Sequence, residues 1–254
     1  MQHYGTITVV GGGCYGTYYV RQLGRASAAG ALAYDRLVVV DRDPGCRVAR
    51  EALAPAPGGR AGHAPGPEVL IAAWASYFAD YLSTAAGTDA AVFDAIVPSP
   101  LMPHLMYEWL LQRARARWPG RVVETRPVGR EPNIPWQRRA PDDTQYVSFA
   151  EWMCPINCIE PATCPAIRGP RTWSLPRALD AYVRAERGRG RDLVGPIIFQ
   201  CTHRAYGVGM IDARDVVAAD ALVADAGARG TTEVLVATTS HCHGAVNLLG
   251  IGAA

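Results

Sequence analysis

The sequence of 254 residues has little net charge and no long apolar run. Arginine and lysine together number 25 against 23 acidic residues, which leaves a formal charge of +2. Because the charges are nearly balanced, we expect no general attraction to nucleic acid or to a membrane. We expect a small-molecule substrate or a redox partner protein instead. No apolar stretch is long enough to cross a bilayer, and the N-terminus lacks the basic and apolar regions of a signal peptide. We therefore expect a cytoplasmic protein, with its oligomeric state left open.

The seven cysteines are more informative in their clustering than in their number. In a reducing compartment cysteines argue little for disulfides, and clusters of them favour metal ligation or redox chemistry. Cys154, Cys158 and Cys164 lie within eleven residues, and two further clusters combine cysteine with histidine. These are Cys201 with His203, and the run His241-Cys242-His243.

The order of apolar segments predicts an α/β fold, a Rossmann-like open parallel sheet with helices on both faces. Strands are expected at Ile7–Val10, Leu37–Val40, Ala91–Val97, Tyr146–Phe149, Pro196–Cys201 and Glu233–Ala237, and helices after Gly16, after Pro100 and over Asp212–Asp225. We expect a single elaborated domain, 1–254, in three parts. Residues 1–126 form the nucleotide-binding half, 127–195 an irregular insertion rich in proline and cysteine, and 196–254 a closing βαβ unit.

A glycine turn follows the first expected strand and precedes the first expected helix. In Gly11-x-Gly13-x-x-Gly16 the first glycine permits a tight turn, the second lets the backbone approach a pyrophosphate, and the third lets helix and strand pack closely. The helix behind the turn offers free N–H groups and the positive end of its dipole to a phosphate. Asp41 ends the second strand, where its carboxylate is placed to accept hydrogen bonds from a ribose. Cys14 lies within the turn, next to any bound nucleotide.

Through VVGGGCYG and VVVDRD the chain resembles the Rossmann-fold dinucleotide-binding superfamily. The resemblance covers only the first βαβ unit. It implies NAD(P) or FAD as the cofactor and gives Gly11, Gly13, Gly16 and Asp41 cofactor-binding roles. It does not identify a reaction. The chain has no lysine, so it lacks the Tyr-x-x-x-Lys pair of the short-chain dehydrogenases.

The cysteine loop predicts a metal centre of one of two kinds. Cys154, Cys158 and Cys164 do not have the spacing of common zinc knuckles, and two of them precede proline, as cysteines of ferredoxin loops do. An iron–sulfur cluster and a zinc ion both remain open, since spacing alone seldom identifies the metal. Cys201, Cys242 or a histidine is the expected fourth ligand. Redox-active or purely structural thiols are the remaining interpretation.

His203, His241 and His243 are the candidate catalytic residues. Alternate residues of an extended segment point to the same side, so His241 and His243 are expected to face one metal or substrate while Cys242 points away. We also expect the last strand to deliver them to the same sheet edge as Gly11. Imidazoles in such a pocket would supply or remove a proton.

Taken together, these patterns predict a redox protein, in the first place an oxidoreductase that binds a dinucleotide and a Cys/His-ligated metal. Three alternatives stay open. The first is a non-catalytic protein that handles a metal or senses a nucleotide, and the second is a zinc-dependent hydrolase or lyase. In the third, a structural subunit, the thiols only brace a loop.

Overall fold

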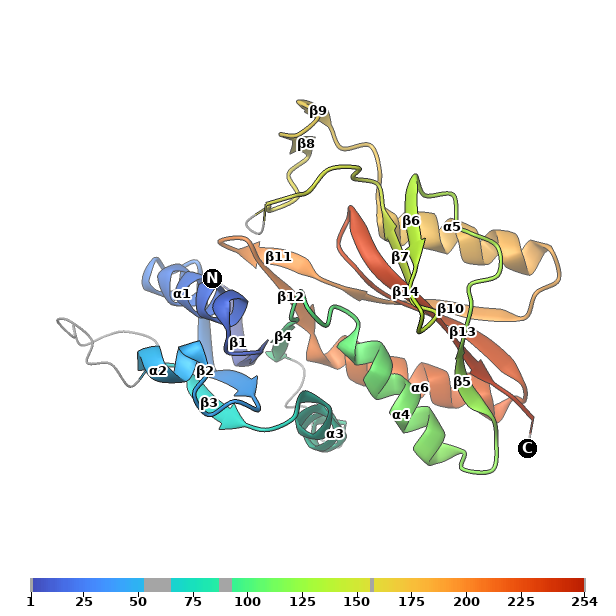
Figure 1. Cartoon of the computed structure of the whole chain (residues 1–254), viewed down its shortest axis with the longest axis horizontal. Coiled ribbons are helices and arrows are strands. Elements are labelled where there is room, and N and C mark those ends of the chain that lie inside the picture. Colours follow the sequence, from blue (N-terminus) through green and yellow to red (C-terminus); the bar gives the residue numbers. More distant parts are fainter. Residues whose placement is uncertain (1, 53–64, 87–92, 156–157, 254) are drawn as a thin grey trace. The chain divides into compact units, whose positions relative to one another are not determined.

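The computed structural model describes residues 2–52, 65–86, 93–155 and 158–253. Contacts within the chain divide it into two compact units (Figure 1). The first unit comprises Met1–Met102 and Cys201–Val217, and the second comprises Pro103–Gln200 and Ala218–Ala254. The expectation of a single elaborated domain stays a prediction, because each unit is described by itself.

The sheet of the first unit is parallel at its centre. Its strand order is β11-β12-β4-β1-β2-β3, in which β1, β2, β3 and β4 are parallel and β11 and β12 are antiparallel additions beside β4. Ile7, Val9 and Val39 are completely buried, as expected for strands covered on both faces. The strands are β1 (Gln2–Val10), β2 (Leu32–Asp41), β3 (Glu68–Ile71), β4 (Ala95–Val97), β11 (Thr202–Ala205) and β12 (Val208–Asp212). The helices are α1 (Cys14–Ala28), α2 (Arg47–Ala52) and α3 (Trp74–Ala85).

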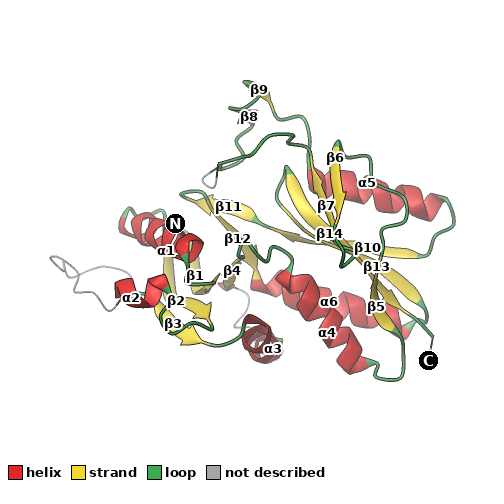
Figure 2. Ribbon diagram, viewed as in Figure 1, coloured by secondary structure: helices red, strands yellow, loops and turns green. Residues whose placement is uncertain are grey.

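The sheet of the second unit is mostly antiparallel. Its order is β10-β13-β14-β7-β6, with β5 also paired to β14, and only β10 and β13 are parallel neighbours (Figure 2). The strands are β5 (Val123–Arg126), β6 (Trp136–Arg139), β7 (Gln145–Ser148), β10 (Leu193–Gln200), β13 (Thr232–Thr239) and β14 (His243–Ile251). A two-stranded sheet joins β8 (Thr163–Cys164) to β9 (Gly169–Pro170).

Helices complete the second unit. They are α4 (Leu105–Arg117), α5 (Leu175–Gly188) and α6 (Ala213–Ala228), the last of which begins in the first unit. Apolar side chains at helical spacing on α5 pack on the sheet through Leu175, Leu179 and Val183. Their sheet partners include Leu235 and Val246, and this contact forms the core of the unit. Among the helices that the structure describes, none has the length and hydropathy that a membrane crossing needs.

The α/β class is confirmed, but the arrangement differs from the expected single sheet. The strands form two six-stranded sheets and one two-stranded sheet, and the segment 127–195 is not irregular throughout, because it supplies β6, β7 and α5 to the second unit. A strand also follows the expected last one: β14 returns antiparallel to β13 along its whole length. The glycine turn and the His-Cys-His run therefore follow strands of different sheets, and the expectation that they share an edge is wrong. One expectation falls partly outside the described residues, the start of the strand expected at 91–97.

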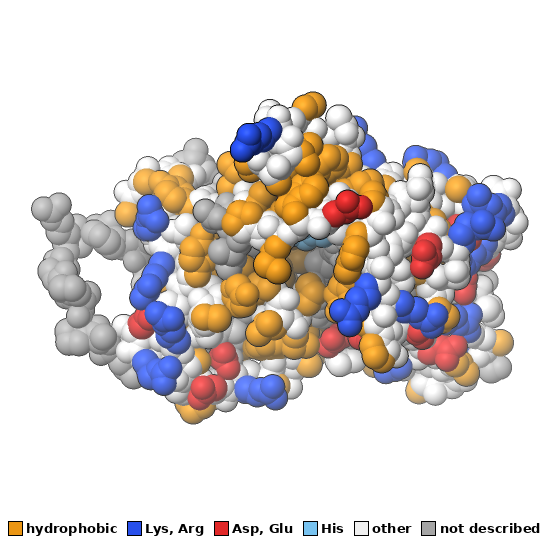
Figure 3. All heavy atoms as spheres, turned by 45° about the horizontal axis from the view of Figure 1, so that its top comes forward, with side chains coloured by type: hydrophobic (Ala, Val, Ile, Leu, Met, Phe, Trp, Pro, Cys, Tyr) orange, Lys and Arg blue, Asp and Glu red, His pale blue; other side chains and the backbone are white. Residues whose placement is uncertain are grey.

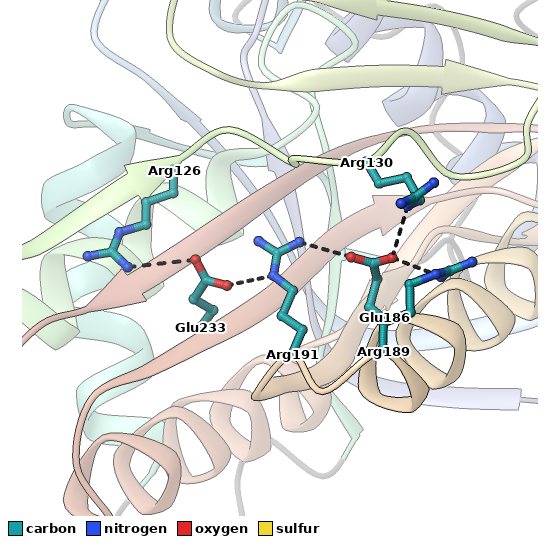
Figure 4. Close-up of polar contacts among 6 residues, drawn as sticks. All are labelled: Arg126, Arg130, Glu186, Arg189, Arg191 and Glu233. Atoms are coloured by element: carbon teal, nitrogen blue, oxygen red, sulfur yellow. Dashed lines mark hydrogen bonds and ion pairs between the residues drawn. The ribbon is translucent and has the colours of Figure 1, made fainter.

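Two carboxylates organise an arginine network at the end of α5 (Figure 4). Glu186 has only 8% of its side chain exposed and accepts contacts from three guanidinium groups. Arg191 joins Glu186 to Glu233 on β13, which it contacts at 2.8 Å. The network comprises Arg126, Arg130, Glu186, Arg189, Arg191 and Glu233. It ties the end of α5 and the chain entering β10 to the middle of the sheet.

We predict that Glu186→Ala lowers the stability of the second unit by about 1–2 kcal/mol, because it leaves guanidinium groups without their shared carboxylate. The shift in the urea midpoint measures this loss. Glu51→Ala is the matched control, since Glu51 also bonds two arginines, Arg21 and Arg47, but at an exposed position. A midpoint that moves equally little in both variants would contradict the importance of the network.

Candidate functional site

The glycine turn of the first unit has the backbone geometry that its three glycines allow. Gly11 has a φ of +88°, a conformation that favours glycine, and its N–H donates to the Val40 carbonyl at 2.9 Å. A Cβ atom at Gly16 would lie 1.9 Å from the Gly11 carbonyl oxygen, so only glycine lets α1 approach the end of β1 this closely. At Gly13 no described heavy atom lies within 4 Å of an added Cβ, so the backbone there is open.

Asp41 braces the turn from the end of β2. One carboxylate oxygen accepts the Gly12 N–H at 2.7 Å and the other accepts the Asp43 N–H at 2.9 Å. Carboxylate oxygens have further lone pairs for other donors. Gly12 is a glycine that the spacing of the motif does not explain. A Cβ atom there would lie 2.4 Å from Sγ of Cys46, a buried side chain of the same unit.

Helix α1 begins directly after this turn. Gly13 is the N-cap, and within the described part of the chain no side chain caps the helix. The first turn also contains no acidic residue, so nothing there competes with an incoming anion. Cys14 is the first helical residue and its side chain is exposed. It lies in the turn as expected.

Trp74 closes the turn from the side of β3, and sequence reasoning missed it as a site residue. The indole Nε1–H donates to the Val40 carbonyl at 3.0 Å. Cζ2 of the same ring would be 3.4 Å from a Cβ atom at Gly11. Trp74 is only partly buried. A tryptophan directly after the apolar run Val69–Ala73 was the one available signal.

The second unit contains the cysteine loop, defined here as residues 151–174. Burial raises the pKa of the Cys154 thiol, and the nearby thiol groups of Cys158 and Cys164 add to the rise. The Glu160 carboxylate acts in the same direction. Cys158, Cys164 and Glu160 therefore belong to the electrostatic surroundings of the Cys154 thiol. In the described chain, however, no three His, Cys, Asp or Glu side chains are grouped tightly enough to hold a metal ion.

Glu160 fastens the cysteine loop to the turn between β13 and β14. Its carboxylate accepts the backbone N–H of His241 at 2.9 Å and that of Cys242 at 3.3 Å. Arg171 bonds the Glu160 carbonyl at 3.0 Å and so holds the loop backbone. The Glu160 carboxylate therefore has backbone partners and is not simply a solvated loop side chain. Two clusters far apart in the sequence, the cysteine loop and the His-Cys-His run, are joined through it.

His241 and Cys242 form the turn between β13 and β14, and His243 is the first residue of β14. Ser240 Oγ accepts the N–H groups of Cys242 and His243, which closes the turn on itself. Cys242 is buried and its Sγ accepts a hydrogen bond from Trp173 at 3.3 Å. Burial raises the pKa of this thiol to about 11, so it is neutral at neutral pH. His243 is exposed, whereas His241 is partly buried, and its Nδ1 has no hydrogen-bond partner in the described chain.

Cys201 and His203 share one side of the β11–β12 hairpin in the first unit, as their alternate spacing predicts. A Cβ atom at Gly209 would lie 2.4 Å from Cys201 Sγ and 3.5 Å from His203 Nε2. The thiol and the imidazole therefore lie above the same glycine. The predicted metal ligands Cys154, Cys158, Cys164 and Cys242 belong to the second unit, whereas Cys201 belongs to the first.

One family model matches the sequence over most of the second unit. The family described as "Uncharacterized protein, C-terminal domain" (AF_1314_C) matches residues 106–252, more than half of the chain. The chain belongs to this family. The AF_1314_C match includes the cysteine loop and the His-Cys-His turn, whereas the glycine turn lies before it. No curated protein and no solved structure matches the chain.

The thiol environments of this AF_1314_C member predict selective labelling. At pH 8 iodoacetamide should label Cys14 and spare Cys242, because Cys14 is exposed while Cys242 is buried with a pKa of about 11. Between pH 7 and pH 9.5 the Cys242 rate should rise about tenfold per pH unit without levelling off. Mass spectrometry of the peptides measures both rates. Equal labelling of the two thiols at pH 8 would disprove a buried, neutral Cys242.

Proposed function

We propose that the first unit binds a dinucleotide, NAD(P) or FAD, and that the protein is a redox protein, in the first place an oxidoreductase. The observation that carries the proposal is the contact at Gly16, where any side chain would strike the Gly11 carbonyl. A tight turn alone needs a glycine only at its positive-φ position. Close packing of a helix N-terminus on the strand end is the further requirement of a pyrophosphate site.

Strand order supports a Rossmann-like interpretation of this unit. From β1 the chain proceeds to β2 and then β3 on one side, and β4 pairs with β1 on the other side. The order therefore reverses beside β1, and ligands of open α/β sheets bind at the carboxyl ends of strands where the order reverses. Gly11 directly follows β1, so the turn lies at this point.

Each part of the proposed ligand has a group suited to it. The first N–H groups of α1 and its dipole would hold the pyrophosphate next to the open backbone of Gly13. Asp41 would accept hydrogen bonds from a ribose with its remaining lone pairs. The bound nicotinamide or flavin would supply the hydride or electron chemistry. His203, from the same sheet, is the group we propose for the accompanying proton transfer.

A carboxylate at residue 13 tests this site without disturbing the fold. We expect Gly13→Asp to weaken NAD, NADP or FAD binding at least about tenfold, because a negative charge would face the phosphates. Its stability should not fall: the added atoms meet open space, and aspartate is a favoured N-cap. Calorimetric titration and the thermal midpoint measure the two effects.

Gly24→Ala is the control for that experiment. Gly24 lies in the same helix and an added Cβ there also meets no described atom within 4 Å. This variant should bind as the parent does and be more stable by up to about 1 kcal/mol, since alanine favours helix. The proposal would be refuted by a parent protein that binds none of the three dinucleotides, or by undiminished binding in Gly13→Asp.

As a second function we propose that the cysteine loop holds a metal, zinc or an iron–sulfur cluster. The supporting observation is that Cys158 and Cys164 both act on the pKa of Cys154. A cation would relieve the repulsion of thiolates gathered in this way, and thiolates are the ligands that both metals prefer. The described thiols are not already arranged as a metal site, so the metal would have to draw the loop inward.

The outer surface of the loop fits the redox partner protein that we propose for such a centre. Met153 is 96% exposed, and Ile159 and Ile167 are also exposed. Figure 3 shows hydrophobic side chains gathered at the top of the molecule, where β8 and β9 lie in Figure 1. Exposed apolar patches of this kind mark contact sites for other proteins.

Metal analysis decides the second proposal. Protein purified without oxygen should contain roughly stoichiometric zinc or iron, and an iron–sulfur cluster would add broad visible absorption. The triple change Cys154→Ser, Cys158→Ser and Cys164→Ser should remove the metal, whereas Cys14→Ser should retain it because Cys14 is in the other unit. A parent protein that contains neither metal would refute the proposed metal site, but it would not affect the proposal of a dinucleotide site.

A further inference from the structure

An open pocket of about 570 Å³ lies within the first unit, away from the glycine turn. Gln2, His3 and Tyr4 line this pocket and are the first three residues of β1, whereas Gly11 follows the last residue of that strand. The pocket is therefore at the opposite end of β1 from the proposed dinucleotide site. Its volume is within the range of small-molecule binding sites.

Arg204 on β11 lines the pocket with a guanidinium group that is only partly used. Its Nη1 and Nη2 donate to the two carboxylate oxygens of Asp212 at 2.6 and 2.7 Å, and Nη1 also donates to the Tyr4 hydroxyl at 3.3 Å. The other two N–H groups, one on Nε and one on Nη2, have no acceptor in the described chain. They lie side by side on one edge of the guanidinium, and such an edge binds both oxygens of a carboxylate or phosphate.

The other polar groups of the pocket wall are also mainly donors. Arginine cannot accept a hydrogen bond, so the Tyr4 hydroxyl accepts from Arg204 and its own proton is left for another partner. Arg214 contacts Asp212 and Asp215 only at 3.8 Å, and 59% of its side chain is exposed. Both oxygens of Asp212 already accept from Arg204. A ligand that satisfies these donors must therefore bring acceptor atoms.

We propose that this pocket binds a small organic carboxylate that has an aromatic group. The carboxylate would accept the two remaining N–H groups of Arg204 and the Tyr4 O–H, with Arg214 as the second cation. With His3 neutral, the two arginines and one aspartate among the described lining residues leave a formal charge of +1. A carboxylate matches this charge, whereas a phosphate monoester, at about −2, exceeds it.

Phe93 provides the reason to expect an aromatic group on the ligand. It lines the same pocket, and 65% of it is exposed. An exposed phenyl ring beside a carboxylate-binding edge favours a ligand with a flat apolar part. The pocket has no residue in common with the proposed dinucleotide site, so this proposal does not depend on that one.

Three probes that contain one phenyl ring each separate the effect of charge from that of the ring. Benzoate is a monocarboxylate, phenyl phosphate is close to a dianion, and benzyl alcohol is neutral. We expect benzoate to bind at least about tenfold more tightly than benzyl alcohol, since a hydrogen bond to a charged group contributes this much affinity. Phenyl phosphate should bind this pocket no more tightly than benzoate. Calorimetric titration measures the three affinities.

Variants of the two arginines test whether benzoate binds in this pocket. Arg204→Lys keeps a cation for Asp212 but loses the edge with two N–H groups, so benzoate should bind about tenfold more weakly. Arg214→Gln, at an exposed position, should weaken benzoate binding about threefold. Arg36→Gln is the matched control and should bind as the parent does. Arg36 is 57% exposed beside Glu68 in the same unit, but it does not line the pocket.

Tyr4→Phe tests the proposal even if Arg204→Lys fails to fold. It removes only the hydroxyl group, so benzoate should bind about threefold more weakly while the affinity for benzyl alcohol stays the same.

Three results would overturn the carboxylate site. The first is benzoate binding no tighter than that of benzyl alcohol, and the second is benzoate affinity that is unchanged in the folded pocket variants. The third is phenyl phosphate that binds more tightly than benzoate and loses this advantage in Arg214→Gln. None of these results bears on dinucleotide binding at the glycine turn, so failure of this proposal and failure of the proposed function are distinguishable.

Discussion

The carbonyl of Val40 is the acceptor on which the candidate nucleotide site depends. It is the last carbonyl of β2 before Asp41, and it takes the Gly11 N–H at 2.9 Å and the Trp74 indole N–H at 3.0 Å. Gly11 can donate there and still turn the chain toward α1 because its φ is +88°. That turn places the Gly11 carbonyl against α1, which is why residue 16 must be a glycine. Two of the three fingerprint glycines, Gly11 and Gly16, are thus consequences of one backbone contact.

In the second unit the carboxylate of Glu160 is the acceptor that has the same organising role as the Val40 carbonyl. Turns between antiparallel strands expose N–H groups that need acceptors, and here the side chains of Ser240 and Glu160 supply them. Glu160 reaches the turn with a φ of +51°, a conformation uncommon outside glycine. Arg171, bonded to the carbonyls of residues 160 and 161, holds the backbone in that conformation. The cysteine loop is therefore fixed to the sheet at a defined point, close to its thiols.

Local patterns predicted the parts of the fold that neighbouring residues determine. The apolar runs gave β1 and β2, and the glycine spacing gave the turn that the structure contains. Local patterns could not predict contacts between segments that are distant in the sequence. Trp74 belongs to the candidate site because it bonds the carbonyl of Val40, which is 34 positions away in the sequence. Glu160 likewise bonds the backbone of a turn that is 81 positions away. The strand β14 was missed for a related reason: its turn is closed by Ser240 and Glu160 and has no Gly-rich hairpin signature.

The order of strands along the chain explains why the two expected clusters do not share one edge. Between β10 and β13, which are parallel neighbours in the second sheet, the chain leaves to form β11 and β12 of the first sheet. There β12 pairs with β4, and its residues Met210 and Ile211 are buried at 0% and 1% exposure. The segment that matches the AF_1314_C family thus contributes two strands to the unit that carries the glycine turn. Neither unit is one continuous stretch of chain, and the buried side chains of β12 make a segment from the C-terminal half of the sequence part of the first unit.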